Sequence, residues 1–290
     1  MRRVSQAVEQ VISEHEAAGR RFRADDVGSF VREEGEGPPV VCFHGVPSSS
    51  FLYRKVNAEL AARGLRGIAF DFPGLGLAER PADFDYSWSG LARWSGAAID
   101  ALGIDRCHLV IHDVGGPVGA EWAVRNPDRV LSMTVLNTPL NVATFHRPWS
   151  MHPFSIPRVG ELYLRSMTRF ALTQLFQLQG IGDRGAVDKA EIGAYYDLLK
   201  REDGGAAFLR IMRGFELTQD KQDFLWEGLA ERAYPASVVW GKDDPALGME
   251  FCRIACDVLN VDEPTLVPAK HFLQEDQAPA IAEVVKAMAA

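Results

Sequence analysis

The chain has 290 residues, enough for one large α/β domain or two small ones with a substantial buried core. Hydrophobic residues make up 47% of it and charged residues 24%, which excludes disorder, a collagen-like repeat and a disulfide scaffold. The net charge of -8, from 39 acidic and 31 basic residues, argues against a nucleic-acid or anionic-membrane surface and favours a small neutral ligand.

The N-terminal residues 1–20 are predicted to form an amphipathic helix that packs on the fold, with Val4, Val8 and Val11 on one side. This segment lacks the uninterrupted apolar core of a secretory leader, and no other segment approaches the roughly 20 apolar residues of a membrane span. The four cysteines are spread over the chain, so neither a disulfide framework nor a metal site is expected. We therefore predict a cytoplasmic protein.

From residue 28 onward, short apolar strands and helices alternate. Continuous apolar strands separated by helices are typical of a parallel sheet covered on both faces, so we expect a mostly parallel, doubly wound α/β sheet. The alternation stops between 139 and 230, which we predict to be an inserted helical lid on a core of 1–138 and 231–290. The predicted strands are 28–35, 40–44, 66–71, 107–112, 130–137, 236–241 and 264–268, with helices at 50–63, 87–102, from 115, at 247–259 and at 279–290.

The segment VIHDVGGPVG carries the sharpest chemical signal, because an apolar strand runs into Asp113, then Gly115 and Gly116, and then a helix. Such a tight strand-to-helix turn is a nucleophile elbow, which holds its central side chain above the sheet edge. The N–H groups that open the helix also stabilise an anion there. Asp113 is thus a candidate nucleophile, although by itself the segment fits a helix N-cap equally well.

Other polar residues follow three further strands in an order that supports catalysis. HGVP ends a core strand, so the backbone N–H groups of Val46 and Val114 could form an oxyanion hole. Asp244 follows the strand after the lid, and His271 follows the last strand. Nucleophile, acid and base then occur in the chain order expected of this architecture, each beyond the carboxyl end of a strand. This combination favours a nucleophilic role for Asp113 over a role as a helix N-cap.

Five segments, HGVPSSSFLYRKV, DFPGLGLAERP, HDVGGPVG, GKDDPALG and KHFLQED, are together similar to the haloalkane dehalogenase and epoxide hydrolase branch of the α/β-hydrolases. The similarity spans roughly 28–290 apart from much of the lid, and it is greatest to haloalkane dehalogenases. It implies that Asp113 is the nucleophile, His271 the base and Asp244 the acid that orients the base. Asp243 is an alternative acid, but Asp244 directly precedes a proline, as in the family.

The resemblance also implies a reaction in two steps. The Asp113 carboxylate displaces a halide or opens an epoxide at saturated carbon and forms an alkyl ester. His271, steadied by Asp244, then activates water to attack that ester, and the N–H groups of Val46 and Val114 hold the oxyanion. No cofactor or metal is needed, so the expected partners are a small apolar substrate and water, without nucleic acid or membrane.

The sequence departs from the family at the residues that stabilise the leaving group. Haloalkane dehalogenases usually place a tryptophan after the nucleophile and either an asparagine in HG-x-P or a lid tryptophan, whereas this chain has Val114 and Val46. An uncompensated buried charge costs several kcal/mol, which weakens the halide hypothesis. Donors that stabilise the leaving group must then come from the lid. Each aromatic side chain of the lid could either contact the substrate or simply pack against its neighbours. The substrate-binding candidates are Trp149, Tyr163, Tyr195, Tyr196 and Trp226, with His146 and His152 as further donors to an epoxide.

Three functions remain open at this stage. Halide hydrolysis is the primary prediction and epoxide hydrolysis the alternative. A non-catalytic ligand-binding member of the fold is a third possibility, which the complete set of Asp113, Asp244 and His271 disfavours. His112 and His108 lie in the elbow strand and are predicted to have structural roles.

Overall fold

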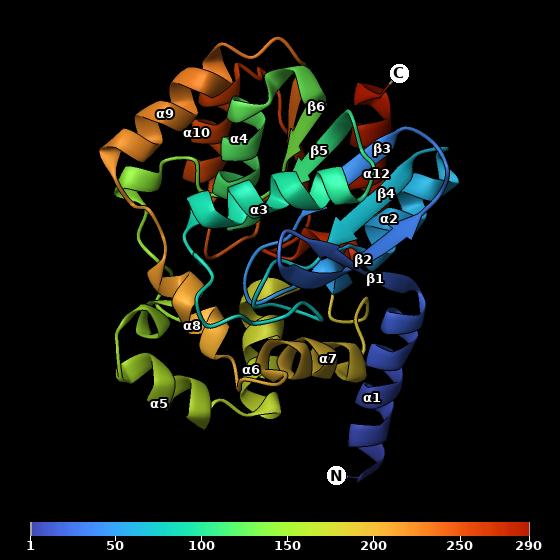
Figure 1. Ribbon diagram of the computed structural model, residues 1–290, viewed down its shortest axis with the longest axis vertical. Coiled ribbons are helices and arrows are strands. Elements are labelled where there is room, and N and C mark those ends of the chain that lie inside the picture. The colour runs from blue at the N-terminus through green and yellow to red at the C-terminus, as the bar shows by residue number, and fades with distance from the viewer. Residues whose placement is uncertain (1, 290) are drawn as a thin grey trace.

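A mostly parallel sheet forms the centre of the protein, and in the computed structural model, which describes residues 2–289 and the side chains of 5–289, it has eight strands. The strands are β1 (Gly19–Ala24), β2 (Val27–Glu34), β3 (Pro39–Phe43), β4 (Arg66–Phe70), β5 (Cys107–Ile111), β6 (Val130–Val135), β7 (Ala236–Gly241) and β8 (Thr265–Val267). Their spatial order is β1-β2-β4-β3-β5-β6-β7-β8 (Figure 1). β2 pairs antiparallel with both β1 and β4, and the pairs among β3 to β8 are parallel, which confirms the predicted mostly parallel sheet.

Helices cover both faces of this sheet. On one face α3 packs against α4, and α4 packs on β3 and β5; on the other face α12 packs against α2, β6 and β7. The α3 helix begins where the Ser87 hydroxyl oxygen accepts the N–H of Gly90, an N-cap contact. These core helices and helical turns are η1 (Ser50–Tyr53), α2 (Arg54–Ala62), α3 (Trp88–Ala101), α4 (Gly115–Arg125), η2 (Pro127–Arg129), α10 (Met249–Leu259), α11 (Leu273–Asp276) and α12 (Ala278–Met288).

The segment between β6 and β7 is helical and forms a cap beyond the carboxyl ends of the parallel strands (Figure 1). The last of its helices, α9, falls within the predicted insertion but packs against α4 and α10 of the core. The elements are η3 (Val142–Thr144), η4 (His152–Ser155), α5 (Val159–Ser166), α6 (Arg169–Leu175), the π-helical turn η5 (Phe176–Gly180), α7 (Lys189–Lys200), α8 (Ala206–Arg213) and α9 (Gln219–Ala230).

The N-terminal helix is shorter than predicted. Helix α1 (Arg2–Ala17) ends at residue 17, and β1 begins at Gly19, so the prediction of helix up to residue 20 was wrong. Gly19 lies so close to β2 that a side chain there would meet the Val31 carbonyl oxygen at 2.4 Å, which favours strand pairing at this point. Within residues 2–289, no helix combines the length and apolar character needed to cross a membrane.

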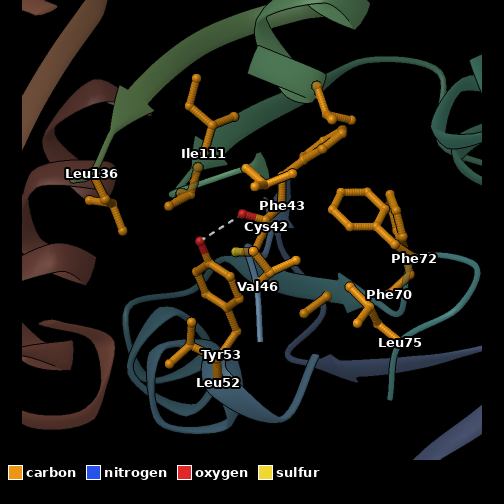
Figure 2. Packing of buried hydrophobic residues seen from close by; sticks show 14 of the residues in the cluster. Cys42, Phe43, Val46, Leu52, Tyr53, Phe70, Phe72, Leu75, Ile111 and Leu136 are labelled. Atoms are coloured by element: carbon orange, nitrogen blue, oxygen red, sulfur yellow. Dashed lines mark hydrogen bonds between the residues drawn. The ribbon is translucent and has the colours of Figure 1, made fainter. Parts of the chain in front are cut away.

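Apolar side chains pack tightly below the ends of β3, β4 and β5 (Figure 2). The rings of Phe43 and Phe70 meet edge to face at 5.5 Å, and Phe72 packs against both of them. The Tyr53 hydroxyl donates to the carbonyl oxygen of Phe43 at 3.1 Å, which satisfies a buried polar group (Figure 2). This packing fixes the strand ends from which the polar residues of the next section extend.

Candidate active site

Asp113 sits in a sharp turn between β5 and α4, with a backbone φ of 50°. Residues other than glycine rarely adopt this left-handed conformation, so neighbouring contacts must hold it. The Asp113 N–H donates to the carbonyl of Asn137 at 2.9 Å, and the Thr138 hydroxyl donates to the Asp113 carbonyl at 2.6 Å. A side chain at Gly116 would meet Thr138 Oγ1 at 1.7 Å, so glycine lets α4 start this close. Helix α4 begins without a side-chain cap, which leaves the N-cap alternative for Asp113 unsupported.

The two carboxylate oxygens of Asp113 have different surroundings. Oδ1 accepts the backbone N–H of Val46 at 2.7 Å, and the Val114 N–H also stabilises this carboxylate. Oδ2 lies 3.4 Å from Nε2 of His271. A side chain at Gly45 would meet Oδ1 at 2.1 Å, so glycine is required for this approach. Oδ1 is therefore held by the backbone N–H of Val46, and Oδ2 lies beside the imidazole.

His271 follows β8, and its ring is held from the side opposite Asp113. Its Nδ1 lies 2.9 Å from Oδ2 of Asp244. Asp244 is buried, and its Oδ1 accepts the N–H groups of Ala246 at 2.7 Å and Leu247 at 3.1 Å. Asn137 completes the arrangement, because its Nδ2 donates to Asp244 Oδ2 at 2.8 Å. Three N–H donors thus hold Asp244 in place in addition to its contact with the imidazole.

The rival acid lies elsewhere. Asp243 is exposed, and its backbone N–H donates to the carbonyl of Ala269. Asp244, and not Asp243, contacts His271.

The charges of these residues are strongly coupled. Burial favours neutral imidazole, but the carboxylates of Asp244 and Asp113 outweigh it and raise the pKa of His271 to about 10. Burial likewise favours the protonated acids, yet His271 outweighs it and lowers the pKa of both Asp113 and Asp244. These opposite shifts in pKa favour a protonated imidazole between two carboxylates in the resting site.

His112, directly before Asp113, has a positioning contact. Its Nε2 lies 2.9 Å from the backbone carbonyl oxygen of His271. Burial, reinforced by the charge of His271, lowers the pKa of His112 to about 3, so the ring is neutral and Nε2–H donates to that carbonyl. His108 instead contacts the Ser132 hydroxyl at 2.8 Å.

A largely apolar cavity of about 80 Å³ opens over Asp113 and His271. One water needs about 10 to 15 Å³ by the same measure, so the cavity has room for a small organic molecule. Most of its wall comes from the cap, and the floor comes from the turns after β3, β5, β7 and β8. Its apolar lining includes Val46, Phe145, Phe154, Leu172, Phe176, Phe208, Met212, Phe215, Leu247 and Phe272.

None of the five predicted substrate-binding aromatics lines this cavity. Trp149 is 70% exposed, and Tyr163 packs its ring on Phe154. The Trp226 indole N–H donates to the carbonyl of Leu140.

The two tyrosines of α7 are also used for packing. The Tyr195 hydroxyl bonds to Glu275, and the Tyr196 hydroxyl donates to the carbonyl of Met167 at 3.0 Å. His146 and His152 are exposed and do not line the cavity.

Three polar cap residues that the sequence interpretation missed do line it, namely Arg147, Ser150 and Gln179. The Ser150 hydroxyl donates to Oε1 of Gln179 at 2.8 Å. This bond occupies the amide oxygen of Gln179 and leaves the amide nitrogen as the group that can donate to a ligand. The carbonyl of Gln179 accepts the N–H of His271 at 3.5 Å, so this residue sits beside the imidazole. No local motif marked any of the three, whereas Asn137 could have been noticed as a polar residue two positions after the end of β6.

Comparisons with known proteins agree with this geometry. The family described as alpha/beta hydrolase fold matches residues 38–278. Haloalkane dehalogenase 2 of Mycobacterium tuberculosis is 42% identical over 274 residues, covering 87% of this chain and 88% of that protein. A haloalkane dehalogenase of Agrobacterium fabrum is 34% identical over 178 residues, which cover 57% of this chain and 56% of that protein.

Solved structures share the fold. An alpha/beta hydrolase fold protein from Burkholderia ambifaria superposes with a TM-score of 0.77 at 26% identity, covering 92% of this chain and 96% of the other. An epoxide hydrolase from Vigna radiata has the same TM-score at 21% identity, with 93% and 97% covered. The fold of this chain is thus shared with a solved epoxide hydrolase.

Proposed function

Because this chain is a hydrolase that belongs to the α/β hydrolase fold family, we propose that it hydrolyses a small organic substrate through a covalent ester on Asp113. The observation that carries the proposal is the different setting of the two Asp113 oxygens. Oδ1 accepts the Val46 N–H at 2.7 Å, while Oδ2 lies 3.4 Å from His271 Nε2 at the cavity floor.

In the first step, Oδ2 of Asp113 attacks a saturated carbon of the substrate. An O–C bond forms, and the bond between carbon and the leaving group breaks, with its electron pair going to the leaving group. The lowered pKa of Asp113 keeps the carboxylate ionised, so no base is needed to activate it. Oδ1, held by backbone N–H groups, becomes the carbonyl oxygen of the ester.

In the second step, His271 loses its resting proton to the solvent and then removes a proton from water, and the water oxygen attacks Cγ of the Asp113 ester. The negative charge develops on Oδ1, where the N–H groups of Val46 and Val114 stabilise it. Collapse breaks the bond between Cγ and Oδ2, and the product alkoxide takes a proton from His271. The remaining carboxylic acid passes its proton to the neutral imidazole of His271, which restores the Asp113 carboxylate and the protonated His271.

A halide is the leaving group that we propose, in line with the haloalkane dehalogenase relatives. Among the described residues, the indole donors that such enzymes usually carry are missing from the cavity. The Gln179 amide nitrogen is a substitute, because Ser150 occupies its oxygen and because its backbone bonds to His271. An N–H donor to a departing anion offsets the cost of burying that charge.

Epoxide opening is the second candidate, since the Vigna radiata epoxide hydrolase has the same fold. Tyrosine hydroxyls do not line the cavity within residues 5–289, so the ring oxygen would also depend on Gln179. We further propose a cytoplasmic location, which suits the four free thiols.

A single turnover in ¹⁸O-labelled water tests the ester. Enzyme in excess is mixed with 1-bromobutane or with 1,2-epoxybutane, and the Asp113 peptide and the product are analysed by mass spectrometry. We expect ¹⁸O in Asp113 and unlabelled oxygen in butanol. Label in the alcohol, with none in Asp113, would mean that water attacks the substrate directly and would refute the ester.

The same experiment identifies the substrate class. Bromide release supports dehalogenation, and a diol without bromide release supports epoxide opening. In the His271→Gln variant the ester should persist as an added butyl mass on the Asp113 peptide, because the second step lacks its base.

A further inference from the structure

The cavity wall contains a cation without a carboxylate partner. Arg147 lines the cavity together with Asp113, and within the described residues no carboxylate oxygen lies within 4.0 Å of its guanidinium nitrogens. Two other cap arginines do have carboxylate partners, Arg169 with Asp197 and Arg213 with Glu161. Arg147 therefore departs from the usual arrangement, in which a buried charge has a counter-ion.

The guanidinium is held in place but keeps most of its hydrogen-bonding capacity. Its Nη2 donates to the carbonyl of Met212 at 2.7 Å, and its plane lies over the Phe215 ring at 4.4 Å. Its Nε is buried without a partner among the described residues. A guanidinium carries five N–H groups, so these contacts orient it and leave donors for a ligand.

A second arginine shows what a purely structural role looks like in this protein. Arg232 is also half-buried without an ion pair among the described residues, but it donates to the carbonyls of Leu229 and Leu259. These carbonyls belong to the last turns of α9 and α10, which lack intrahelical donors. Arg147 makes one bond of the same kind, to Met212 in the last turn of α8. What distinguishes the two arginines is that Arg147 lines the cavity and Arg232 does not.

We propose that Arg147 binds a carboxylate group of the substrate, so that this enzyme acts on small organic anions with an apolar body and a leaving group on saturated carbon. The proposal rests on the function proposed above and specifies its substrate class. A planar guanidinium suits a carboxylate, because both groups can form two parallel hydrogen bonds.

Electrostatics support the same ligand. A substrate carboxylate in the cavity would be repelled by the Asp113 carboxylate unless a cation offset that charge, and Arg147 is the arginine of the cavity lining. Burial lowers the pKa of Arg147, as expected for a cation removed from water without a counter-ion. A bound carboxylate would supply the missing negative charge.

Binding is tested first, without chemistry. Asp113→Asn, which cannot form the ester, is titrated calorimetrically with butanoate and with its neutral isostere butanamide. We expect butanoate to bind roughly 10- to 100-fold more tightly, the range for a charge-assisted hydrogen bond. Adding Arg147→Met should abolish this preference, because methionine retains the packing on Phe215 but lacks the charge. Equal binding of the two ligands to Asp113→Asn would overturn the proposal.

Kinetics with matched substrates then test specificity. For 4-bromobutanoate, Arg147→Met should lower kcat/KM roughly 10- to 100-fold, while 1-bromobutane should change less than about threefold. Arg232→Met is the control for losing a half-buried arginine and should affect both substrates alike. If Arg147→Met does not fold, Arg147→Lys replaces it, and the expected result is a smaller loss confined to 4-bromobutanoate.

Two outcomes separate this proposal from the function on which it rests. If Arg147→Met slows both substrates equally and weakens inhibition by bromide, the arginine serves the departing halide and not a substrate carboxylate, which overturns the inference. If no substrate places ¹⁸O in Asp113, the proposed reaction fails, but a preference for butanoate would still support an anion-binding cavity.

Discussion

At the residue scale, the charge on Asp113 controls its neighbour His271. In the resting site, two carboxylates raise the pKa of His271 to about 10, so the imidazole is protonated and cannot accept a proton from water. In the proposed mechanism, formation of the ester neutralises one of the two carboxylates, and the pKa of His271 must then fall. The proposed base would thus become competent only after Asp113 has reacted.

The first prediction concerns the acid beside that base. Asp244→Asn should lower kcat roughly 10³- to 10⁴-fold, because an amide can no longer stabilise the imidazolium or fix the ring tautomer. Rapid-quench kinetics should show that ester formation is retained and that ester hydrolysis is slowed. The exposed neighbour Asp243→Asn is the matched control and should remain within about twofold of wild type. A comparable loss in Asp243→Asn would contradict the assignment.

The sequence predicted that Asp113, Asp244 and His271 would lie together, because each one follows an apolar strand and the carboxyl ends of parallel strands meet at one edge. It could not predict Arg147 or Gln179. Their positions depend on how cap helices dock on the core, and that docking is not encoded in a local pattern. The same limit explains why Trp149 and Trp226 were proposed for a cavity that they do not line.

At the scale of elements, a buried ionic cluster fastens the cap to the core. Arg54 of α2 donates from Nη1 and Nη2 to Glu275 of α11 at 2.6 and 2.8 Å, and to Glu191 of α7 at 2.7 Å. The Tyr195 hydroxyl, also on α7, bonds to Glu275. Lys55 lies 3.0 Å from the same carboxylate. Three elements distant in sequence thus share one cluster of four charged side chains.

Glu275→Gln should therefore destabilise the protein by about 3 to 5 kcal/mol, the usual cost of leaving a buried charge without its partner. Urea unfolding followed by circular dichroism measures this change. Glu283→Gln removes one of the two carboxylate partners of Arg63 at an exposed position, and its effect should stay below about 1 kcal/mol. Similar losses in the two variants would show that the buried cluster does not stabilise the attachment of the cap.

The elements were predictable where periodicity was clear. Each parallel strand was predicted within a few residues, because an apolar run with turn residues at its ends has few alternatives. Strand β1 was missed because its sequence, GRRFRA, carries three arginines and lies at the sheet edge, where most of its residues are not buried. Its pairing with β2 comes from tertiary contacts and not from strand propensity.

At the scale of the whole molecule, the N-terminal helix supports the cap from outside. Helix α1 packs against α7 and β1, and Figure 1 shows it running beside α7 away from the sheet. Val8 is fully buried, and a side chain at Gly193 of α7 would meet its Cγ2 at 2.6 Å. His15, at the other end of α1, contacts the Ser50 hydroxyl of the core at 3.3 Å. One helix thus links cap and core.

Val8→Asp should detach this helix, because it places an unpaired carboxylate in an apolar contact. Hydrogen exchange followed by mass spectrometry should then show the opening free energy of α7 reduced by about 2 to 4 kcal/mol, with that of β5 unchanged. The exposed Gln10→Asp adds the same charge on the same helix and should leave both unchanged. Unaltered exchange in α7 of Val8→Asp would mean that the cap does not need α1.

Backbone hydrogen bonds join the cap turn η5 to the loop that carries His271, and they limit which caps could replace the present one. The N–H of His271 donates to Gln179, and that of Phe272 donates to Gly180 at 2.8 Å. A chimera that grafts a relative's cap onto this core would therefore exchange the anchor of the imidazole along with the substrate walls. We expect such a chimera to be active with the relative's substrates only if the grafted cap retains a turn whose carbonyl groups can accept these two N–H groups. Changes to the cap that alter substrate specificity therefore also affect the position of His271.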